Sequence, residues 1–439
     1  MGDEWYTRGR MGIKILNQKT LASTPLRRDA LRIMKAGIQA VETGVVVKKR
    51  VSRTGEKLLI DKKSYRLDRY ERIFVVGVGK ASYDAGKALE SILGDRITDG
   101  IVLDVKGGKL KYLKSLVGTH PFPSHTNIRA TAEMLGILKG VTAKDLVITV
   151  ISGGGSALLC WPHQLECDDV TMITQVLMKR GATIHELNTV RKHISEIQGG
   201  QLAGLAYPAT VASLIFSDVP GDDISMVASG PTVLDVTTVK DAQRVMKKYQ
   251  VLDLCRLEKC DLRETPKDPL LFSHVQNVLM VSNEVAVEAM KKKAKELGYA
   301  PVVYSTQLDG EAREAGKLFA SLVKPGQALI GAGETTVTIR GTGEGGRNQE
   351  FVLGALETLQ PHSLLLSLAS DGIDNGPMAG ALIDDQVKKM VQEKNLDLDL
   401  YLQQNNSLPF FQETESFIKT GMTGVNVSDL MLCLQKKMS

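Results

Sequence analysis

The stretch RIFVVGVGKAS, residues 72–82, decides the fold class of this chain. After its leading arginine, the first part is continuously apolar and does not alternate with polar residues, which indicates a strand buried on both faces. A turn with two glycines follows, and residues 81–93 then carry the apolar periodicity of a helix. Strand, turn and helix in this order are typical of a parallel α/β sheet, so we expect that architecture.

The same succession of buried strands and helices extends over most of the chain. In the first half we expect helices at 25–43, 128–138 and 169–179, strands at 100–105, 146–151 and 211–216, and a polar hairpin or extended arm at 45–70. In the second half we expect helices at 284–297, 310–323 and 348–359, and strands at 278–281, 301–304, 328–331, 337–340, 364–369 and 430–434.

A charged segment without periodicity, residues 253–273, separates the two halves and contains two prolines. We therefore expect two three-layer α/β/α domains with a cleft between them, because each series of buried strands needs helices on both faces. The N-terminal domain is expected at 24–252 and the C-terminal domain at 274–439, joined by the linker 253–273. Residues 1–23 are expected to be an arm or a tag.

Composition excludes several classes of protein. The chain has 439 residues, of which 43% are hydrophobic, so it can bury sizeable cores. A net charge of +5 is too balanced for an obligate nucleic-acid binder but suits anionic small molecules. Five cysteines without a CxxC pair argue against a zinc site and a disulfide framework. No apolar run is long enough to cross a membrane, and the N-terminus lacks an apolar signal segment, so we expect a cytoplasmic protein unless a native targeting segment has been replaced.

Chemistry-bearing residues follow the predicted strands, where parallel sheets place their ligands. Residues 152–156, SGGGS, can present several backbone N–H groups to an anion. Gly77 and Gly79 half-match a dinucleotide fingerprint, and Asp104 ends the next strand, where an acid would bind a ribose. Ser82 stands in place of the third glycine, so a nicotinamide enzyme remains an alternative.

Charged residues at helix starts and strand ends indicate phosphate chemistry. Lys80 begins a helix, where a cation gains nothing from the helix dipole, and Arg191 is a second candidate cation. Arg347 follows four glycines at the start of a helix, an arrangement suited to a phosphate. Carboxylates at strand ends can hold Mg²⁺ or deprotonate a hydroxyl, and they include Asp218, Glu334 and Asp371. Because the histidines form no catalytic pattern, these residues favour phosphoryl transfer by positioning and charge.

Seven blocks of sequence carry a resemblance to a known family. They are VGVGKAS at 76–82, ISGGGSALL at 151–159, LNTVRKHISEIQGGQLA at 187–203, SDVPGDDISMVASGPT at 217–232, GAGETTV at 331–337, GGRNQE at 345–350 and TGMTGVNVSDL at 420–430. Together and in this order they resemble the class II glycerate kinase family. The resemblance implies a Rossmann-like N-terminal domain with a parallel sheet and a C-terminal MOFRL-type α/β domain with a mixed sheet. It further implies ATP- and Mg²⁺-dependent phosphorylation of D-glycerate, commonly at the 2-hydroxyl.

The residues and the resemblance together assign expected roles. We expect catalytic roles for Lys80, Arg347 and Asp218. D-Glycerate is expected to contact Arg191 and the loop Ser152, Gly153, Gly154, Gly155 and Ser156. The nucleotide is expected at Gly77, Gly79, Glu334, Thr335 and Asn348, and the metal at Asp218, Glu334 and Asp371. Met378 stands where the family has an acid or threonine, which weakens a metal role for the loop around Asp371.

Two other functions stay open at this point. The fingerprint of Gly77, Gly79 and Asp104 would suit an NAD(P)H-dependent hydroxypyruvate reductase, a label that many members of the family carry. A non-enzymatic sugar-phosphate-binding module would also use such glycine turns, although it needs no acidic metal site. We expect a small-molecule substrate, no nucleic acid, no membrane, and a monomer or homodimer.

Overall fold

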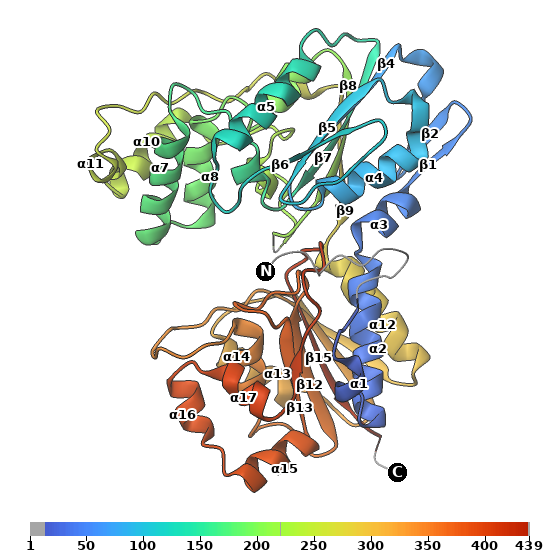
Figure 1. Ribbon diagram of the computed structural model, residues 1–439, viewed down its shortest axis with the longest axis vertical. Coiled ribbons are helices and arrows are strands. Elements are labelled where there is room, and N and C mark those ends of the chain that lie inside the picture. The colour runs from blue at the N-terminus through green and yellow to red at the C-terminus, as the bar shows by residue number, and fades with distance from the viewer. Residues whose placement is uncertain (1–13, 220, 438–439) are drawn as a thin grey trace. The chain divides into compact units, whose positions relative to one another are not determined.

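The computed structural model describes residues 14–219 and 221–437, and it divides into two compact units (Figure 1). Thr43–Val281 form one unit, called here the N-terminal unit. The chain from Ser282 onward forms the other, the C-terminal unit, together with the residues up to Glu42. Within the described residues, no helix has both the length and the apolarity that a membrane span requires.

A parallel sheet of six strands is the centre of the N-terminal unit. Its order is β6-β5-β4-β7-β8-β9, and every neighbouring pair runs parallel. The strands are β4 (Arg72–Val78), β5 (Asp99–Asp104), β6 (Lys114–Val117), β7 (Asp145–Ser152), β8 (Thr210–Phe216) and β9 (Val275–Val281). The order of the strands reverses between β4 and β7, and such a switch point is where doubly wound sheets bind their ligands.

Helices and a small second sheet complete this unit. The helices are α3 (Thr43–Arg50), α4 (Ser82–Leu93), α5 (His125–Leu138), α6 (Gly155–Leu158), α7 (Cys167–Lys179), α8 (Ile184–His193), α9 (Gln201–Ala206), α10 (Val239–Lys248) and α11 (Val251–Cys255). An antiparallel sheet contains β1 (Val51–Thr54), β2 (Lys57–Ile60) and β3 (Lys63–Arg66), so the expected arm at 45–70 is the end of a helix followed by three short strands. Helices α7, α8, α10 and α11 enclose an apolar core of their own (Figure 1).

A mixed sheet forms the C-terminal unit, as the family resemblance implies. Its order is β10-β11-β15-β12-β13-β14; β10 and β11 are parallel, and the remaining neighbours are antiparallel. The strands are β10 (Ala300–Leu308), β11 (Gln327–Gly333), β12 (Ser363–Ala369), β13 (Gly380–Asp384), β14 (Phe417–Ile418) and β15 (Asp429–Gln435). Every residue of β15 is buried, and this strand is inserted between β11 and β12.

Helices cover both faces of this second sheet. Figure 1 shows α1 (Gln18–Leu21), α2 (Pro25–Ala40) and α12 (Asn283–Glu296) on one face. The other helices are α13 (Ala312–Ser321), α14 (Arg347–Gly354), α15 (Asp385–Lys394), α16 (Leu398–Gln403) and α17 (Ser407–Glu413). The core beneath α13, α14 and α17 contains four fully buried phenylalanines, Phe319, Phe351, Phe410 and Phe411. The chain is therefore an α/β protein with one parallel and one mixed sheet.

The division of the chain differs from the expected boundaries at both ends. Strand β9 lies in the segment assigned to the C-terminal domain, yet it pairs with β8 and completes the first sheet. Helix α2 belongs to the C-terminal unit, where Arg27 forms a buried ion pair with Asp384 at 2.7 Å. Periodicity shows which face of a helix is apolar but not which sheet it covers, so the predicted boundaries followed the chain order.

Residues 337–340, expected to form a strand, do not form one. Among the described residues, the only β-bridge next to this segment is an isolated one between Glu311 and Thr336. The hydroxyl and N–H of Thr338 bond to the carboxylate of Glu311, and the N–H of Arg340 bonds to Asn405. Side-chain oxygens therefore replace the backbone partners that a strand would need.

The buried ion pair of α2 gives a first prediction. Arg27→Ala removes both hydrogen bonds to Asp384 and leaves a buried carboxylate unpaired, so it should lower the free energy of unfolding by about 3 kcal/mol or more. The neighbouring exposed Arg28 is the control. Arg28→Ala should change the free energy of unfolding by less than about 0.5 kcal/mol. Urea unfolding measures both. Equal effects of the two substitutions would contradict a structural role of α2 in the C-terminal unit.

Candidate active site

Two loops meet at the switch point of the parallel sheet. Gly79 follows β4 with a φ of +107°, and a Cβ atom there would lie 2.2 Å from the Oγ of Ser152 at the end of β7. The N–H of Lys80 donates to the carbonyl of Gly153 at 2.9 Å, and the N–H of Ala81 donates to Ser152 Oγ at 3.0 Å. Only glycine at position 79 permits this approach, which fixes the backbone of Lys80 against the glycine loop.

Three basic side chains gather over this glycine loop. A Cβ atom on Gly154 would lie 3.2 Å from both His120 Cδ2 and Lys80 Cγ, so both side chains cover that glycine. Burial, with the charges of Lys80 and Arg191, lowers the pKa of His120 to about 4. Burial alone lowers the pKa of Arg191 to about 10. No salt bridge joins Lys80 or Arg191 to a carboxylate among the described residues, so both cations are available to an anionic ligand.

The glycine loop adds unused donors to the cluster. The N–H groups of residues 153–156 donate to no described residue, whereas the next N–H along the chain, that of Ala157, donates to the carbonyl of Gly154. The Oγ of Ser156 is 3.0 Å from the Oγ of Ser229, which donates to the side chain of Asn188 at 2.7 Å. Asp218 borders the loop, since a Cβ atom on Gly153 would lie 1.9 Å from its carboxylate. Backbone donors and two cations thus surround a position suited to an anion.

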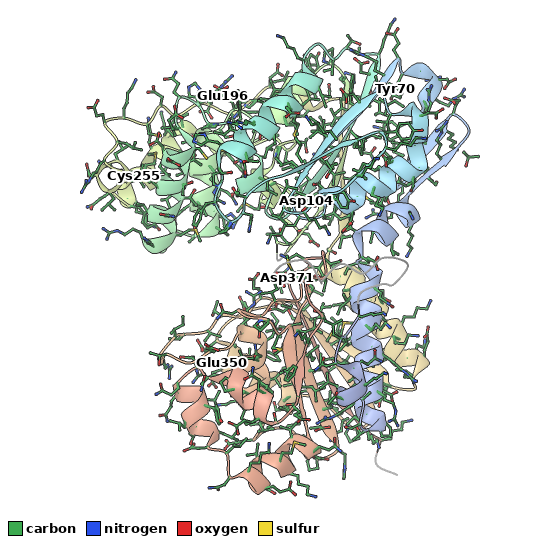
Figure 2. The ribbon with its side chains drawn as sticks, viewed as in Figure 1. Tyr70, Asp104, Glu196, Cys255, Glu350 and Asp371 are labelled. Carbon is green, nitrogen blue, oxygen red and sulfur yellow. The ribbon has the colours of Figure 1, made fainter. Side chains whose placement is uncertain are left out.

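The geometry around α4 does not fit a dinucleotide. The carboxylate of Asp104, labelled in Figure 2, is fully buried and accepts the N–H of Tyr83 in the first turn of α4 at 3.0 Å. The N–H of Gly79 is also used, because it donates to the carbonyl of Leu103. A dinucleotide needs its pyrophosphate at this helix start and its ribose on that carboxylate. A protein carboxylate already occupies the place of the pyrophosphate.

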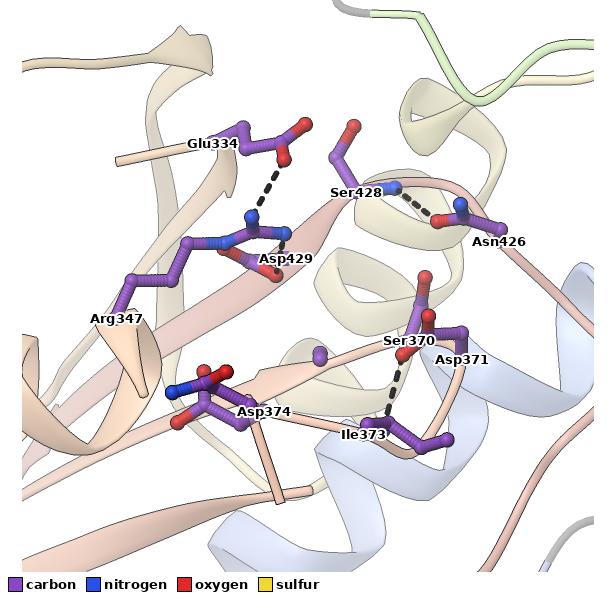
Figure 3. A pocket seen from close by; sticks show the side chains of 11 residues that line it. Glu334, Arg347, Ser370, Asp371, Ile373, Asp374, Asn426, Ser428 and Asp429 are labelled. Atoms are coloured by element: carbon purple, nitrogen blue, oxygen red, sulfur yellow. Dashed lines mark hydrogen bonds and ion pairs between the residues drawn. The ribbon is translucent and has the colours of Figure 1, made fainter. Parts of the chain in front are cut away.

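A polar pocket of about 310 Å³ lies in the C-terminal unit (Figure 3). It opens where β11 and β12 end and where the antiparallel β15 begins. Four carboxylates and one guanidinium line it, among the residues Glu334, Arg347, Ala369, Ser370, Asp371, Ile373, Asp374, Asn375, Asn426, Ser428 and Asp429. Carboxyl ends of parallel strands are the expected place for a ligand, and the excess of acids favours a ligand that carries a cation.

Arg347 is held by two of these carboxylates. Its Nε and Nη2 donate to Asp429 at 2.6 and 3.1 Å, and its Nη1 lies 2.5 Å from Glu334. Burial alone would lower the pKa of Arg347, but Asp429 and Glu334 raise it well above its ordinary value. Burial raises the pKa of Asp429 to about 7, although Arg347 acts in the opposite direction. The arginine is therefore fixed and partly neutralised.

The start of α14 is capped by the protein itself. The N–H groups of Asn348 and Gln349 donate to the carboxylate of Asp374 at 3.0 and 2.9 Å. Burial raises the pKa of Asp374, while these hydrogen bonds lower it. Of the glycines before the helix, Gly341 donates its N–H to Asn405 and Gly343 to a backbone carbonyl. A phosphate at residues 341–350 therefore cannot use these four amides, because protein oxygens accept their hydrogen bonds, whereas the N–H groups of residues 345–347 donate to no described residue.

The other residues expected to bind the nucleotide differ in whether a ligand could reach them. Gly77 lies inside β4, where a Cβ atom would be 2.9 Å from Val102, so its smallness serves packing. Asn348 is buried, and its side chain bonds to Ser367 and Asp374. Thr335 is also buried, but its hydroxyl has no partner among the described residues. Only Glu334 and Thr335 of this set therefore keep a side-chain oxygen that a ligand could use.

The expected metal residues do not form a closed cage. Asp218 lies in the N-terminal unit, while Glu334 and Asp371 line the pocket of the C-terminal unit. Within residues 14–219 and 221–437, no three acids, histidines or cysteines are arranged to hold a metal ion. Mg²⁺ commonly takes one or two protein carboxylates and completes its shell with phosphates and water, so the donor types in this pocket fit it.

Part of both sites was expected from the sequence. The expected residues Lys80, Arg191 and 152–156 lie together, and Glu334, Arg347 and Asp371 share one pocket. His120 was not expected, because the histidines form no catalytic pattern in the sequence, and Asp429 was not expected either. Asp429 begins the antiparallel β15, whereas the expected site residues follow strands or begin helices. The block TGVNVSDL at 423–430 contained the signal.

Comparison with known proteins identifies the family. A family described as a domain of unknown function (DUF4147) matches residues 29–258, and the MOFRL family matches residues 327–429. A glycerate 2-kinase of Pyrococcus horikoshii is 35% identical, over 93% of this chain and 97% of that protein. A putative hydroxypyruvate reductase of Agrobacterium vitis is 35% identical over 83% of this chain and 87% of that protein.

A solved structure agrees with these matches. The crystal structure of a glycerate kinase from Thermotoga maritima superposes with a TM-score of 0.82 and 32% identity, over 93% of this chain and 99% of that one. The parallel sheet, the mixed sheet and the polar sites at their strand ends define a two-domain α/β enzyme. The chain belongs to the class II glycerate kinase family.

The basic cluster predicts a measurable shift in the titration of His120. Arg191→Met should raise the pKa of His120 from about 4 toward its ordinary value, because one of the two neighbouring cations is removed while burial remains. NMR titration of the histidine ring protons measures this pKa. Arg180→Met, at an exposed site, should leave it unchanged. A pKa of His120 near 6.5 in the unmodified protein would contradict the described cluster.

Proposed function

We propose that this protein transfers the γ-phosphoryl group of ATP to the 2-hydroxyl of D-glycerate, giving 2-phosphoglycerate and ADP. The observation that carries the proposal is the pair of unpaired cations, Lys80 and Arg191, beside the unused amides of residues 153–156. Such a site stabilises both a carboxylate and a phosphoryl group. The names of the relatives, glycerate 2-kinase and glycerate kinase, support this choice of substrate.

The geometry suggests a role for each group around the glycine loop. Arg191 and the loop amides bind the carboxylate of D-glycerate, which places the adjacent 2-hydroxyl in a fixed position. Lys80 neutralises the phosphoryl group during transfer. Asp218 borders the same loop and orients or deprotonates the hydroxyl. Positioning and charge supply most of the catalysis in phosphoryl transfer, so this site needs no covalent intermediate.

The acidic pocket is proposed to take the nucleotide phosphates. Arg347 would contact a phosphate oxygen, and Glu334 and Asp371 would hold Mg²⁺ together with oxygens of ATP. The ion would supply charge neutralisation for the transferred group. We further propose that the enzyme works in the cytoplasm.

A hydroxypyruvate reductase is the weaker alternative, supported by the name of one relative. The capped start of α4 and the buried Asp104 argue against it, because they leave no site for a dinucleotide. Incubation with hydroxypyruvate and NADH separates the two functions. A protein that oxidises NADH with hydroxypyruvate, but consumes no ATP with D-glycerate, would be a reductase and not a kinase.

The role of Lys80 can be tested against a lysine of α4, the helix that begins two residues after it. Lys80→Ala should reduce kcat by about 100- to 1000-fold, because it removes one electrostatic contact to the transferring group. Lys87→Ala alters an exposed lysine of α4 and should retain full activity. ADP release with D-glycerate and ATP measures both variants. Near-normal turnover of the Lys80 variant would remove this residue from the proposed mechanism.

The position of the new phosphate can be tested directly. If the carboxylate is clamped by Arg191 and the loop, the 2-hydroxyl is held more rigidly than the 3-hydroxyl and becomes the acceptor. Enolase dehydrates 2-phosphoglycerate but not the 3-isomer, so phosphoenolpyruvate should form at once in a coupled assay. A signal that appears only after phosphoglycerate mutase is added would show that the 3-hydroxyl accepts the phosphate.

A further inference from the structure

The two carboxylates that contact Arg347 differ in their exposure to solvent and in the number of guanidinium nitrogens that they bind. Asp429 is 1% exposed and binds two guanidinium nitrogens, whereas Glu334 is 41% exposed and contacts only Nη1 (Figure 3). A buried bidentate pair cannot lose one partner without leaving an uncompensated charge. An exposed single contact contributes little and exchanges readily with other ligands.

From this difference we propose that Asp429 positions Arg347 permanently, and that Glu334 is a displaceable counter-ion which releases Nη1 to an incoming polyphosphate oxygen. Asp429 is a positioning residue here, since it acts through the arginine. Glu334 acts as a competitor of the ligand for one guanidinium nitrogen. The inference rests on the proposed function only in taking a polyphosphate as the ligand of this pocket.

The backbone around Asp429 supports a fixed role. Asp429 is the first residue of β15, and it pairs with Gly333 of β11 on one side and with Ala369 of β12 on the other. Strands on both sides therefore hold its Cα in place. Arg347 is held as well, because it begins α14, which Asp374 caps through two backbone N–H groups. Both partners of the buried ion pair come from rigid elements.

Glu334 differs because only its backbone is fixed. It follows the last residue of β11, and its N–H donates to the carbonyl of Leu308 at 2.8 Å. Its side chain extends from this anchor toward Nη1 at the rim of the pocket (Figure 3). Rotation of the side chain breaks one ion pair without disturbing the sheet. Release of Nη1 then requires no rearrangement of the fold.

The pocket carries an excess of negative charge, which affects the kind of polyphosphate that can displace Glu334. Glu334, Asp371, Asp374 and Asp429 face a single cation, Arg347, so a polyphosphate without a counter-ion meets repulsion as well as competition from Glu334. A polyphosphate that brings its own cation offers a new partner to the displaced carboxylate. The pocket therefore selects cation-bound nucleotides, and Glu334 is the residue that confers this preference.

The experiment compares ADP binding without divalent cations in matched variants. Calorimetry of the full-length protein with ADP in EDTA should give weak binding. Glu334→Gln should bind this metal-free ADP about tenfold more tightly, because the competing ion pair at Nη1 becomes a neutral contact. Asp371→Asn is the control: it removes one negative charge from the same pocket, but this side chain bonds to the N–H of Ile373 and not to Arg347. Its gain should stay at about twofold.

The third variant tests the positioning role. Asp429→Asn should bind metal-free ADP no more tightly than the unmodified protein, because the arginine loses its anchor. Equal gains for the Glu334 and Asp371 variants would overturn the inference, since charge alone would then explain binding. The inference would also be overturned if Asp429→Asn increased the affinity for metal-free ADP as much as Glu334→Gln does. If thermal unfolding shows that the Asp429 variant does not fold, the comparison of Glu334→Gln with Asp371→Asn still decides.

The outcome is separable from that of the proposed function. Binding of metal-free ADP involves neither D-glycerate nor phosphoryl transfer. An unmodified protein that consumes no ATP with D-glycerate would overturn the proposed function, while a selective gain in the Glu334 variant would still support the exchange at Arg347.

Discussion

The close contact between the loops after β4 and β7 is the constraint on which the N-terminal site depends. Gly79 lies where any side chain would collide with Ser152, and two hydrogen bonds then join the loops across the switch point of the sheet. This contact turns Lys80 over the glycine loop instead of toward the next strand. His120 and Arg191 approach the same place from other segments, so the basic cluster depends on a glycine that carries no chemistry itself.

Carboxylates at the starts of helices determine where anions can and cannot bind. In the N-terminal unit, Asp104 caps α4, and in the C-terminal unit Asp374 caps α14. In both cases backbone N–H groups in the first turn of the helix donate to a protein carboxylate instead of to a phosphate. The short loop at 153–156 differs, because no described carboxylate accepts its amides, so they can take part in ligand recognition. This distinction separates a kinase from a dinucleotide enzyme on a sheet with the same strand order.

The sequence predicted the first sheet well, because continuous apolar runs identify buried strands without knowledge of their partners. Strands β4, β5, β7 and β8 lie where they were expected. The membership of α2 and β9 was not predictable in this way, because an apolar face does not specify which sheet it covers. Lys80 and residues 152–156 could be found because they follow strands. Asp429 begins the antiparallel β15, so only its place in the block at 423–430 could have indicated it. His120 was missed because its environment comes from tertiary contacts with Lys80 and Arg191.

We propose that the cluster of Lys80, His120 and Arg191 binds the anionic substrate. Calorimetry of D-glycerate binding at about pH 5, in buffers with different ionisation enthalpies, tests it most directly. The substrate carboxylate should offset the two cations and raise the pKa of His120 from about 4, so binding should take up protons. His120→Asn should abolish this uptake. Binding of D-glycerate without proton uptake, or equal uptake in the variant, would place the substrate elsewhere and contradict the account.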